Sequence, residues 1–468
     1  MKSRFARPVL AGAAVALIAF AVTAAAPGVG SAGMSLHGWS SHLTPAQANV
    51  LSARADQRVI VLLRDQHTAL AGPSAQAQRA QAFAADRRPI VAQLQQLDVP
   101  RVVAYRTLNA VATTVSAAEA ANLRQDPAVL AVDPDAVIKG PSTNADLLPD
   151  ALRTPVSHAS SHAATGSAKA AAGSSAVCGT ATAPLLEPQA LHLIKADNRT
   201  NANSPIKSGP KSAHSLGYTG AGVSVAVFPD GMDPDLPDFQ RNGQSAVSDY
   251  RDFTGEGTGQ TGGGEAFGDV SSLVAQGQTT YNLDQEINPD FATTGGTCDV
   301  KVLGVAPGAD VDVMKVFGAS NLSFTSEILQ GVDRAIQTDH ADILSMSFGS
   351  TPLPNTAAGQ PLTAILKNAM SDGIVVVAST GDSSPSNTEG SPALDPGVIG
   401  VAASTSYRLF AQTNVFLYDL AQVIHNGSGT QSYHLGQSTP GWLDNEVSTL
   451  SSSGVTEDRR MPDLIAPG

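Results

Sequence analysis

Hydrophobic positions in the second half of the chain follow two alternating patterns. Short runs of Val, Ile, Leu and Ala predict buried strands, and stretches with apolar residues at helical spacing predict the helices between them. The predicted strands are 223–228, 311–316, 341–346, 374–378 and 398–402, and the predicted helices are 265–276, 325–338 and 361–371. Apolar strands that alternate with helices indicate an α/β fold, a parallel sheet with helices on both faces.

A smaller pattern precedes this core at residues 56–138. Its predicted elements are strand 58–63, helix 75–97, strands 102–105 and 108–116, helix 117–124 and strand 129–133. This β-α-β-β-α-β order is typical of a small α+β domain. Residues 139–184 are rich in Ala, Ser, Thr and Gly without a period. Such a composition buries too little apolar surface to offset chain entropy, so we expect a disordered linker, with the core at 185–468.

The N-terminus has the pattern of a secretory signal. Basic residues at positions 2, 4 and 7 precede an apolar run at 9–26, and small residues follow at 24–26 and 30–32. This pattern predicts a signal peptide at 1–32 that is removed on export. A membrane anchor is the alternative, but the run is Ala-rich and short for a span. We therefore expect a secreted, extracellular protein without a membrane anchor.

The amino-acid composition argues against some classes of binding partner. The chain has 41 acidic and 28 basic residues, a formal charge of −13, which argues against nucleic acid or an anionic membrane as partner because both require a basic surface. Cys178 and Cys298 are the two cysteines. In an exported chain they can form one disulfide or remain as thiols, and their spacing is not that of a zinc site.

Four short segments carry the chemistry: 222–233, 304–309, 345–349 and 462–468. Their order and spacing resemble the subtilase and sedolisin superfamily of serine peptidases. The resemblance implies a subtilisin-like core and a serine endopeptidase that cleaves proteins or peptides. In that superfamily an Ala-Pro-Gly segment precedes the turn that carries the nucleophile, so we expect the catalytic serine to lie beyond Gly468 and the catalytic domain to be incomplete in this chain, which alone would be inactive.

The module at 56–138 also resembles a known domain. Residues 109–115 and 126–135 are similar to the inhibitory prodomain of subtilases. The resemblance implies a preproenzyme, a zymogen whose own prodomain assists folding and blocks the cleft until the linker is cut. The alternative is an independent α+β module without an inhibitory role.

The catalytic base departs from the subtilase pattern. No histidine occurs between His214 and His340, where a subtilase has its base at the start of a helix. Glu265 and Asp269 are spaced i, i+4 and share one helix face. They resemble the sedolisin pair, in which Glu is the base toward serine and Asp orients it. Adjacent carboxyls titrate as a unit with one raised pKa, which suits acidic pH. The alternative is that both merely complement the helix dipole.

Two further aspartates are candidates. Asp382 stands where subtilases have the asparagine of the oxyanion hole and sedolisins have aspartate, and a carboxyl donates there only when protonated. The alternative for Asp382 is an ordinary turn residue after Gly381. Alignment with the subtilase motif puts Pro229 at the catalytic aspartate and Asp230 one step beyond. Either the turn is re-registered and Asp230 points into the cleft, or the position has lost its catalytic role.

Ser347, Phe348 and Gly349 correspond to the superfamily segment that pairs with an extended substrate. A site that binds its substrate by backbone pairing accepts extended chains with little discrimination between side chains. This predicts an endopeptidase of broad specificity. Calcium is implied by the resemblance alone. Asp233, Asp235 and the nearby Asp238 lack EF-hand spacing and are expected to cap or solvate a turn. We expect a monomer.

A protein of another class remains as the alternative function. Pro229, the missing histidine and the serine absent from this chain would suit a catalytically inactive pseudopeptidase that acts as a secreted binding or inhibitor protein. A dinucleotide-binding domain is disfavoured, because the glycines at 217–222 precede their strand whereas a phosphate-binding turn follows one.

Overall fold

The computed structural model describes residues 44–52, 55–140, 178–200, 211–257, 259, 261, 264–283, 298–349, 360–383, 388–406, 408, 412, 446–448, 451–453 and 462–467. The chain divides into two units, Met1–Ser40 and Ser41–Gly468, and all described residues belong to the second. The predicted signal peptide at 1–32 therefore lies outside the described residues. Within them, no helix has the length and apolarity needed to span a membrane.

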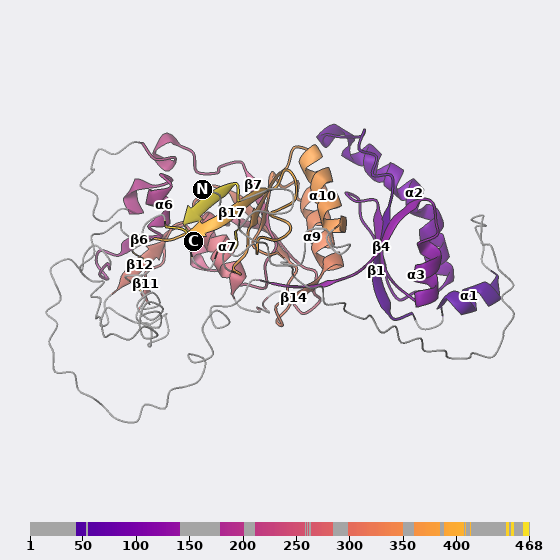
Figure 1. Ribbon diagram of the computed structural model, residues 1–468. Coiled ribbons are helices and arrows are strands. Elements are labelled where there is room, and N and C mark those ends of the chain that lie inside the picture. Colours follow the sequence, from indigo (N-terminus) through magenta and orange to yellow (C-terminus); the bar gives the residue numbers. More distant parts are fainter. Residues whose placement is uncertain are drawn as a thin grey trace, which may run out of the picture. The chain divides into compact units, whose positions relative to one another are not determined.

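A seven-stranded sheet forms the centre of the core, in the order β10-β13-β7-β15-β16-β17-β18 (Figure 1). Every neighbouring pair is parallel. The strands are β7 Ser224–Val227, β10 Val247–Asp252, β13 Asp310–Lys315, β15 Ile343–Met346, β16 Val375–Ser379, β17 Ile399–Ser404 and β18 Leu464–Pro467. The five predicted strands are confirmed. The sequence pattern missed both edge strands, β18 and the half-polar β10.

Helices cover both faces of this sheet. They are α7 Glu265–Val274, α9 Thr325–Gln337 and α10 Gln360–Ser371, each close to its predicted range. Successive residues of a strand point to opposite faces, so Val225 and Val227 of β7 pack with α7, whereas Ala226 packs with α9 and α10. The predicted α/β fold with a doubly covered parallel sheet is confirmed.

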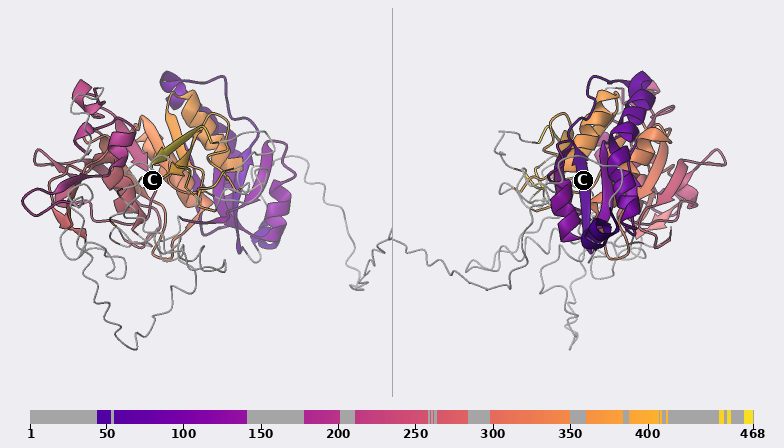
Figure 2. Two further views of the ribbon diagram at one scale, coloured as in Figure 1. Left: turned by 60° about the vertical axis from the view of Figure 1, so that its left-hand side comes forward. Right: turned by 90° about the vertical axis from the view of Figure 1, so that its right-hand side faces the viewer.

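The N-terminal module has the predicted order of elements. They are β1 Gln57–Leu63, α2 Gln76–Gln96, β2 Val102–Ala104, β3 Ala110–Val115, α3 Ala117–Leu123 and β4 Val129–Pro134. The antiparallel sheet has the order β2-β3-β1-β4. Val59 and Val61 of β1 pack with α2 and α3, whereas Ile60 and Leu62 join the cluster of α9 and α10. The module's sheet thus lies between its own helices and those of the core (Figure 1 and Figure 2). A short helix, α1 Pro45–Ser52, precedes it.

Polar contacts across this interface include a buried ion pair and two hydrogen bonds that are more exposed. The Arg79 guanidinium of α2 forms an ion pair with Asp372, and these side chains are 1% and 0% exposed. Asp333 of α9 accepts hydrogen bonds from the backbone amides of Arg106 and Thr107 at 2.9 and 2.6 Å. The module and the core are therefore joined by both apolar packing and charge.

The predicted linker at 139–184 is too long at both ends. Lys139 belongs to β5 Val137–Lys139, which pairs antiparallel with β14 Leu322–Phe324 of the core. At the other end a disulfide joins Cys178 to Cys298 and brings residues 178–184 onto the core. Residues 141–177 of the linker lie outside the described part of the chain.

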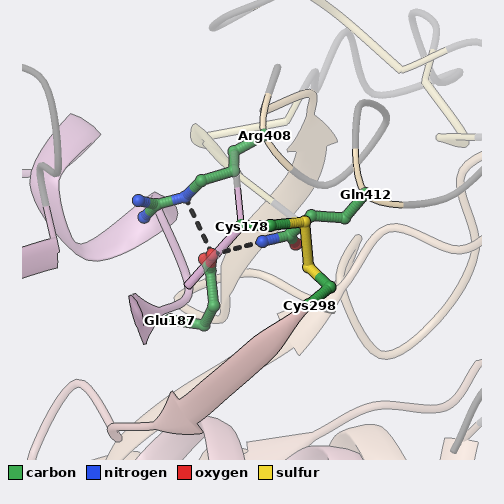
Figure 3. The surroundings of a disulfide bond; sticks show 5 residues. All are labelled: Cys178, Glu187, Cys298, Arg408 and Gln412. Carbon is green, nitrogen blue, oxygen red and sulfur yellow. Dashed lines mark hydrogen bonds and ion pairs between the residues drawn. A yellow bond between two sulfur atoms is a disulfide. The ribbon is translucent and has the colours of Figure 1, made fainter. Parts of the chain in front are cut away.

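The disulfide anchors the first strand of the core. β6 Leu185–Glu187 pairs with β12 Asp299–Val302, directly after Cys298, in a small sheet completed by β11 Tyr281–Asn282. Near the disulfide, Glu187 forms an ion pair with Arg408 at 2.8 Å and accepts a hydrogen bond from Gln412 at 2.6 Å (Figure 3). Short elements complete the described chain: β8 Gln240–Arg241, β9 Gln244–Ser245, α6 Ala190–Leu193, and the 3₁₀ turns η1 Pro73–Ala75, η3 Asn198–Thr200, η4 His214–Leu216 and η5 Pro237–Phe239.

Candidate active site

Asp230 holds the first turn of α7. Its side chain is buried, 1% exposed. One carboxylate oxygen accepts from the amide of Ala266 at 2.9 Å, and the other accepts from the amide of Gly264 at 3.0 Å and from the Thr261 hydroxyl at 2.6 Å. The first amides of a helix have no partner within the helix and carry partial positive charge. Asp230 therefore fastens the helix end from which Glu265 projects.

Gly264 makes this arrangement possible. It precedes α7 with φ +81°, a left-handed conformation that glycine adopts without the steric cost of a Cβ. The sequence showed a glycine run here but gave no sign that Asp230 and Thr261 would bind it. The hydrogen bonds of Asp230 with Thr261 and Gly264 join segments that are about 30 residues apart, so no local pattern records them.

Glu265 and Asp269 lie one turn apart on α7, and Ser347 contacts Asp269. The Ser347 hydroxyl, just beyond β15, donates to Asp269 Oδ1 at 2.7 Å. Asp269 Oδ2 is buried and has no hydrogen-bond partner among the described residues. A buried carboxylate oxygen without a donor is costly, so Asp269 has unused capacity to share a proton.

Burial sets the protonation of the pair. Desolvation raises the pKa of Glu265 to about 8, and the charges of Asp269, Asp230 and Asp382 add to the rise. Desolvation also raises the pKa of Asp269 to about 6; the Ser347 hydrogen bond opposes the rise and the charge of Asp230 supports it. The two carboxyls titrate as a unit, so one proton resides on the pair between about pH 6 and 8.

Asp382 lies after β16, at the same end of the sheet. Its charge is among those that raise the pKa of Glu265, so the two carboxyls are within electrostatic reach of each other. The Asp382 side chain is exposed, whereas a carboxyl that donates to an oxyanion needs a dry environment to stay protonated. The neighbouring loop is held by Ser452, whose hydroxyl accepts from the amide of Ser383 at 2.9 Å.

The segment predicted to pair with substrate divides into three environments. The Ser347 side chain is bound to Asp269. Phe348 is buried, 2% exposed, and its ring packs edge-on against Phe317 with centroids 5.5 Å apart. Gly349 is exposed. The structure therefore connects the predicted substrate segment to the acidic pair through Ser347, a contact that the sequence did not indicate.

Asp233 and Asp238 bind nearby turns, and Asp233 accepts a hydrogen bond from the amide of Asp235 at 2.9 Å. Asp238 accepts hydrogen bonds from the amides of Gln278 and Thr279 and from the Tyr281 hydroxyl. Across the described ranges, no group of three or more His, Cys, Asp or Glu side chains is arranged to hold a metal ion. Calcium thus stays an expectation from the resemblance alone.

Comparison with known proteins identifies the family to which the chain is similar. The model of the subtilase family, Peptidase_S8, matches residues 220–468. Subtilisin E of Bacillus subtilis (strain 168) is 33% identical over 201 residues, 41% of this chain and 44% of that protein. Minor extracellular protease Vpr of the same strain is 32% identical over 199 residues, 42% of this chain and 22% of that protein.

Among solved structures, one titled "S41 Psychrophilic Protease" is 20% identical with a TM-score of 0.34 and covers 53% of this chain and 67% of that chain. The chain spans less than half the length of the two Bacillus relatives. The family match covers more than half of the chain, including all four motifs, α7 and the whole parallel sheet. The chain therefore belongs to the subtilase family.

Proposed function

We propose that the full-length protein is a secreted serine-type endopeptidase in which Glu265 and Asp269 replace the histidine base. The carrying observation is the Ser347–Asp269 hydrogen bond beside an unpartnered, buried Asp269 oxygen, one helical turn from Glu265. With one proton on the pair, transfer of that proton from Glu265 to the unpartnered oxygen of Asp269 leaves Glu265 ionised, and Glu265 can then accept the proton of a nucleophile. Membership of the subtilase family supports a serine peptidase.

The position of β18 supports a nucleophile in the chain that follows. β18 is parallel to β17 and shares the direction of the whole sheet, so Pro467 leaves the sheet at the same edge as β7, β15 and β16. Ligands of such sheets bind beyond the carboxyl ends of the strands. A serine beyond Gly468 would thus lie at the edge where Glu265 and Asp382 are placed, and Asp382 in its protonated form would donate a hydrogen bond to the developing oxyanion.

The N-terminal module is proposed as the inhibitory prodomain of this enzyme. Its buried interface with α9 and α10 and the pairing of β5 with β14 support a stable complex. Signal cleavage at 1–32 and a cut within 141–177 would release a secreted core with its module still bound. The contacts between the cleaved module and the core would then inhibit the core until the module leaves.

The deciding experiment compares the full-length protein with Glu265→Gln. We expect wild-type casein hydrolysis to require the singly protonated pair, so kcat/KM rises near pH 6 and falls near pH 8, because the pKa of Asp269 is raised to about 6 and that of Glu265 to about 8. We therefore expect the enzyme to work at near-neutral pH, whereas the sequence suggested acidic pH. Glu265→Gln should lower kcat/KM by about 10³-fold or more, because removal of a general base costs on this order.

Asp235→Asn is the matched control, because Asp235 is exposed and lies outside the pair. It should leave the pH profile unchanged. Full activity in Glu265→Gln would remove the pair from the mechanism. A wild-type protein that is folded but inactive from pH 4 to 9, and inert toward a serine-directed fluorophosphonate, would instead be the inactive binding protein.

A further inference from the structure

β14 is a short core strand whose one sheet neighbour among the described residues is β5. Leu322, Ser323 and Phe324 pair with Lys139, Ile138 and Val137 in antiparallel register. The segment before β14 contains Phe317, whose ring packs on Phe348 of the predicted substrate segment. The extended chain 137–140 therefore lies along a strand next to the candidate active site, in the manner of a peptide that adds a strand to a sheet.

Two positions of the chain 137–140 are turned toward the core, and they hold residues of different size. Alternate residues of a strand face the same side. Ile138 is half-buried and packs against the core cluster of α9 and α10, whereas Val137 and Lys139 are exposed. Two residues after Ile138, Gly140 is buried, and its amide donates to the carbonyl oxygen of Asn321 at 2.9 Å.

A side chain at the position of Gly140 would require Asn321 to move. A Cβ there would lie 2.1 Å from Asn321 Oδ1 and 3.1 Å from Phe317 Cδ1. Phe317 is fully buried and held by Phe348, so it cannot recede without disturbing a close-packed core. Asn321 is 8% exposed, which leaves its amide group little room to turn away.

We propose that Asn321 is a specificity-determining residue, which makes β14 select extended polypeptides with glycine two residues after an apolar residue. The inference rests on the proposed function: once the module leaves, a substrate takes the place of β5 on β14. The chemical class of substrate is an extended chain with the pattern apolar residue, any residue, glycine. Asn321 disfavours every other residue type at the last of these positions, because its side chain would contact the Cβ.

The first test needs no catalysis and uses the chain of 468 residues. Gly140→Ala should increase hydrogen exchange at the amides of β14 and at position 140 by about tenfold, because overpacking a closed site costs on this order. Asn321→Gly, combined with it, should restore protection. Asn321 has φ +55°, which glycine adopts freely, so Asn321→Gly keeps the turn. Lys139→Ala, at the exposed neighbouring position, is the control and should change exchange little.

The second test uses the full-length enzyme and paired peptides that differ by Gly or Ala at one position. The wild type should prefer Gly by about tenfold in kcat/KM, and Asn321→Gly should bring the ratio of kcat/KM for the Gly and Ala peptides close to one. Normal exchange in Gly140→Ala, no rescue by Asn321→Gly, or an active wild type that accepts both peptides equally would overturn the inference. A wild type without peptidase activity would refute the proposed function, and the exchange experiment would then decide the role of Asn321 alone.

Discussion

At the residue scale, the dominant feature is Glu265, because burial of its carboxyl opposes ionisation. Glu265 is held near three other carboxyls that each raise its pKa. Electrostatic self-repulsion of this kind destabilises the folded state wherever the group is charged. Such strain is common at functional sites, where a proton has to be bound and released near neutral pH.

A pH-dependent stability follows. The pKa of Glu265 rises from 4.5 to about 8 on folding, so between these values the folded state binds a proton that the unfolded state does not. The contribution of Glu265 to stability is therefore present below about pH 4.5 and is lost as pH rises toward 8. Glu265→Gln should raise the free energy of unfolding at pH 8 by about 1–3 kcal/mol and have no effect at pH 4.

Urea unfolding at the two pH values measures this difference. Asp235→Asn, which changes an exposed carboxyl, provides the control for net charge. An equal effect of Glu265→Gln at both pH values would mean that the glutamate is not held in a desolvated site.

At the element scale, α7 is positioned by its two ends. Asp230 binds the first turn, and the loop after β12 binds the last turn, where the amides of Val305 and Ala306 donate to the carbonyl oxygens of Ser272 and Leu273. Neither end is free to fray, so the carboxyls on the helix keep a defined place at the edge of the sheet.

Loss of the cap should loosen the active-site end of this helix. Asp230→Ala leaves the amides of Gly264 and Ala266 without their acceptor, and we expect a loss of about 2 kcal/mol in unfolding free energy. Amide exchange in the first turn of α7 should increase, while exchange in α9 stays constant. Asp230→Asn keeps one acceptor oxygen and should lose less. Unchanged exchange in α7 for Asp230→Ala would show that the helix end is held by other contacts.

At the scale of the whole molecule, the module and the core share one apolar cluster and a buried ion pair. Breaking a buried pair leaves one uncompensated charge, which costs more than removing both partners. Arg79 and Asp372 are each almost fully buried, so they meet the condition for this asymmetry.

A double-mutant cycle tests the coupling. Arg79→Met alone should destabilise the protein by about 3 kcal/mol, because Asp372 stays buried without its cation, and Arg79→Met with Asp372→Asn should cost less than the sum of the single changes. Thermal unfolding of the four proteins measures the coupling energy. Additive effects would indicate that the two side chains act independently.

The sequence alone determined the elements and the pairing of carboxyls on one helix face. Strand runs such as those of β7 and β15 and the i, i+4 spacing of Glu265 and Asp269 are local, and burial of apolar side chains dictates local periodicity. The order of the module's strands and helices followed from the same periodicity. The half-polar edge strand β10 was not predicted, because an edge strand need not be apolar on both faces.

Only the tertiary structure decided which distant residues meet. The Asp230 cap on α7, the Ser347–Asp269 hydrogen bond, the Cys178–Cys298 disulfide and the contact of Gly140 with Asn321 each join residues that are tens to nearly two hundred positions apart. Sequence periodicity reports which face of an element is buried, but not which side chain of another element lies against it. The raised pKa values depend on those contacts and on burial, so the pH range in which the carboxyl pair titrates could be stated only with the fold.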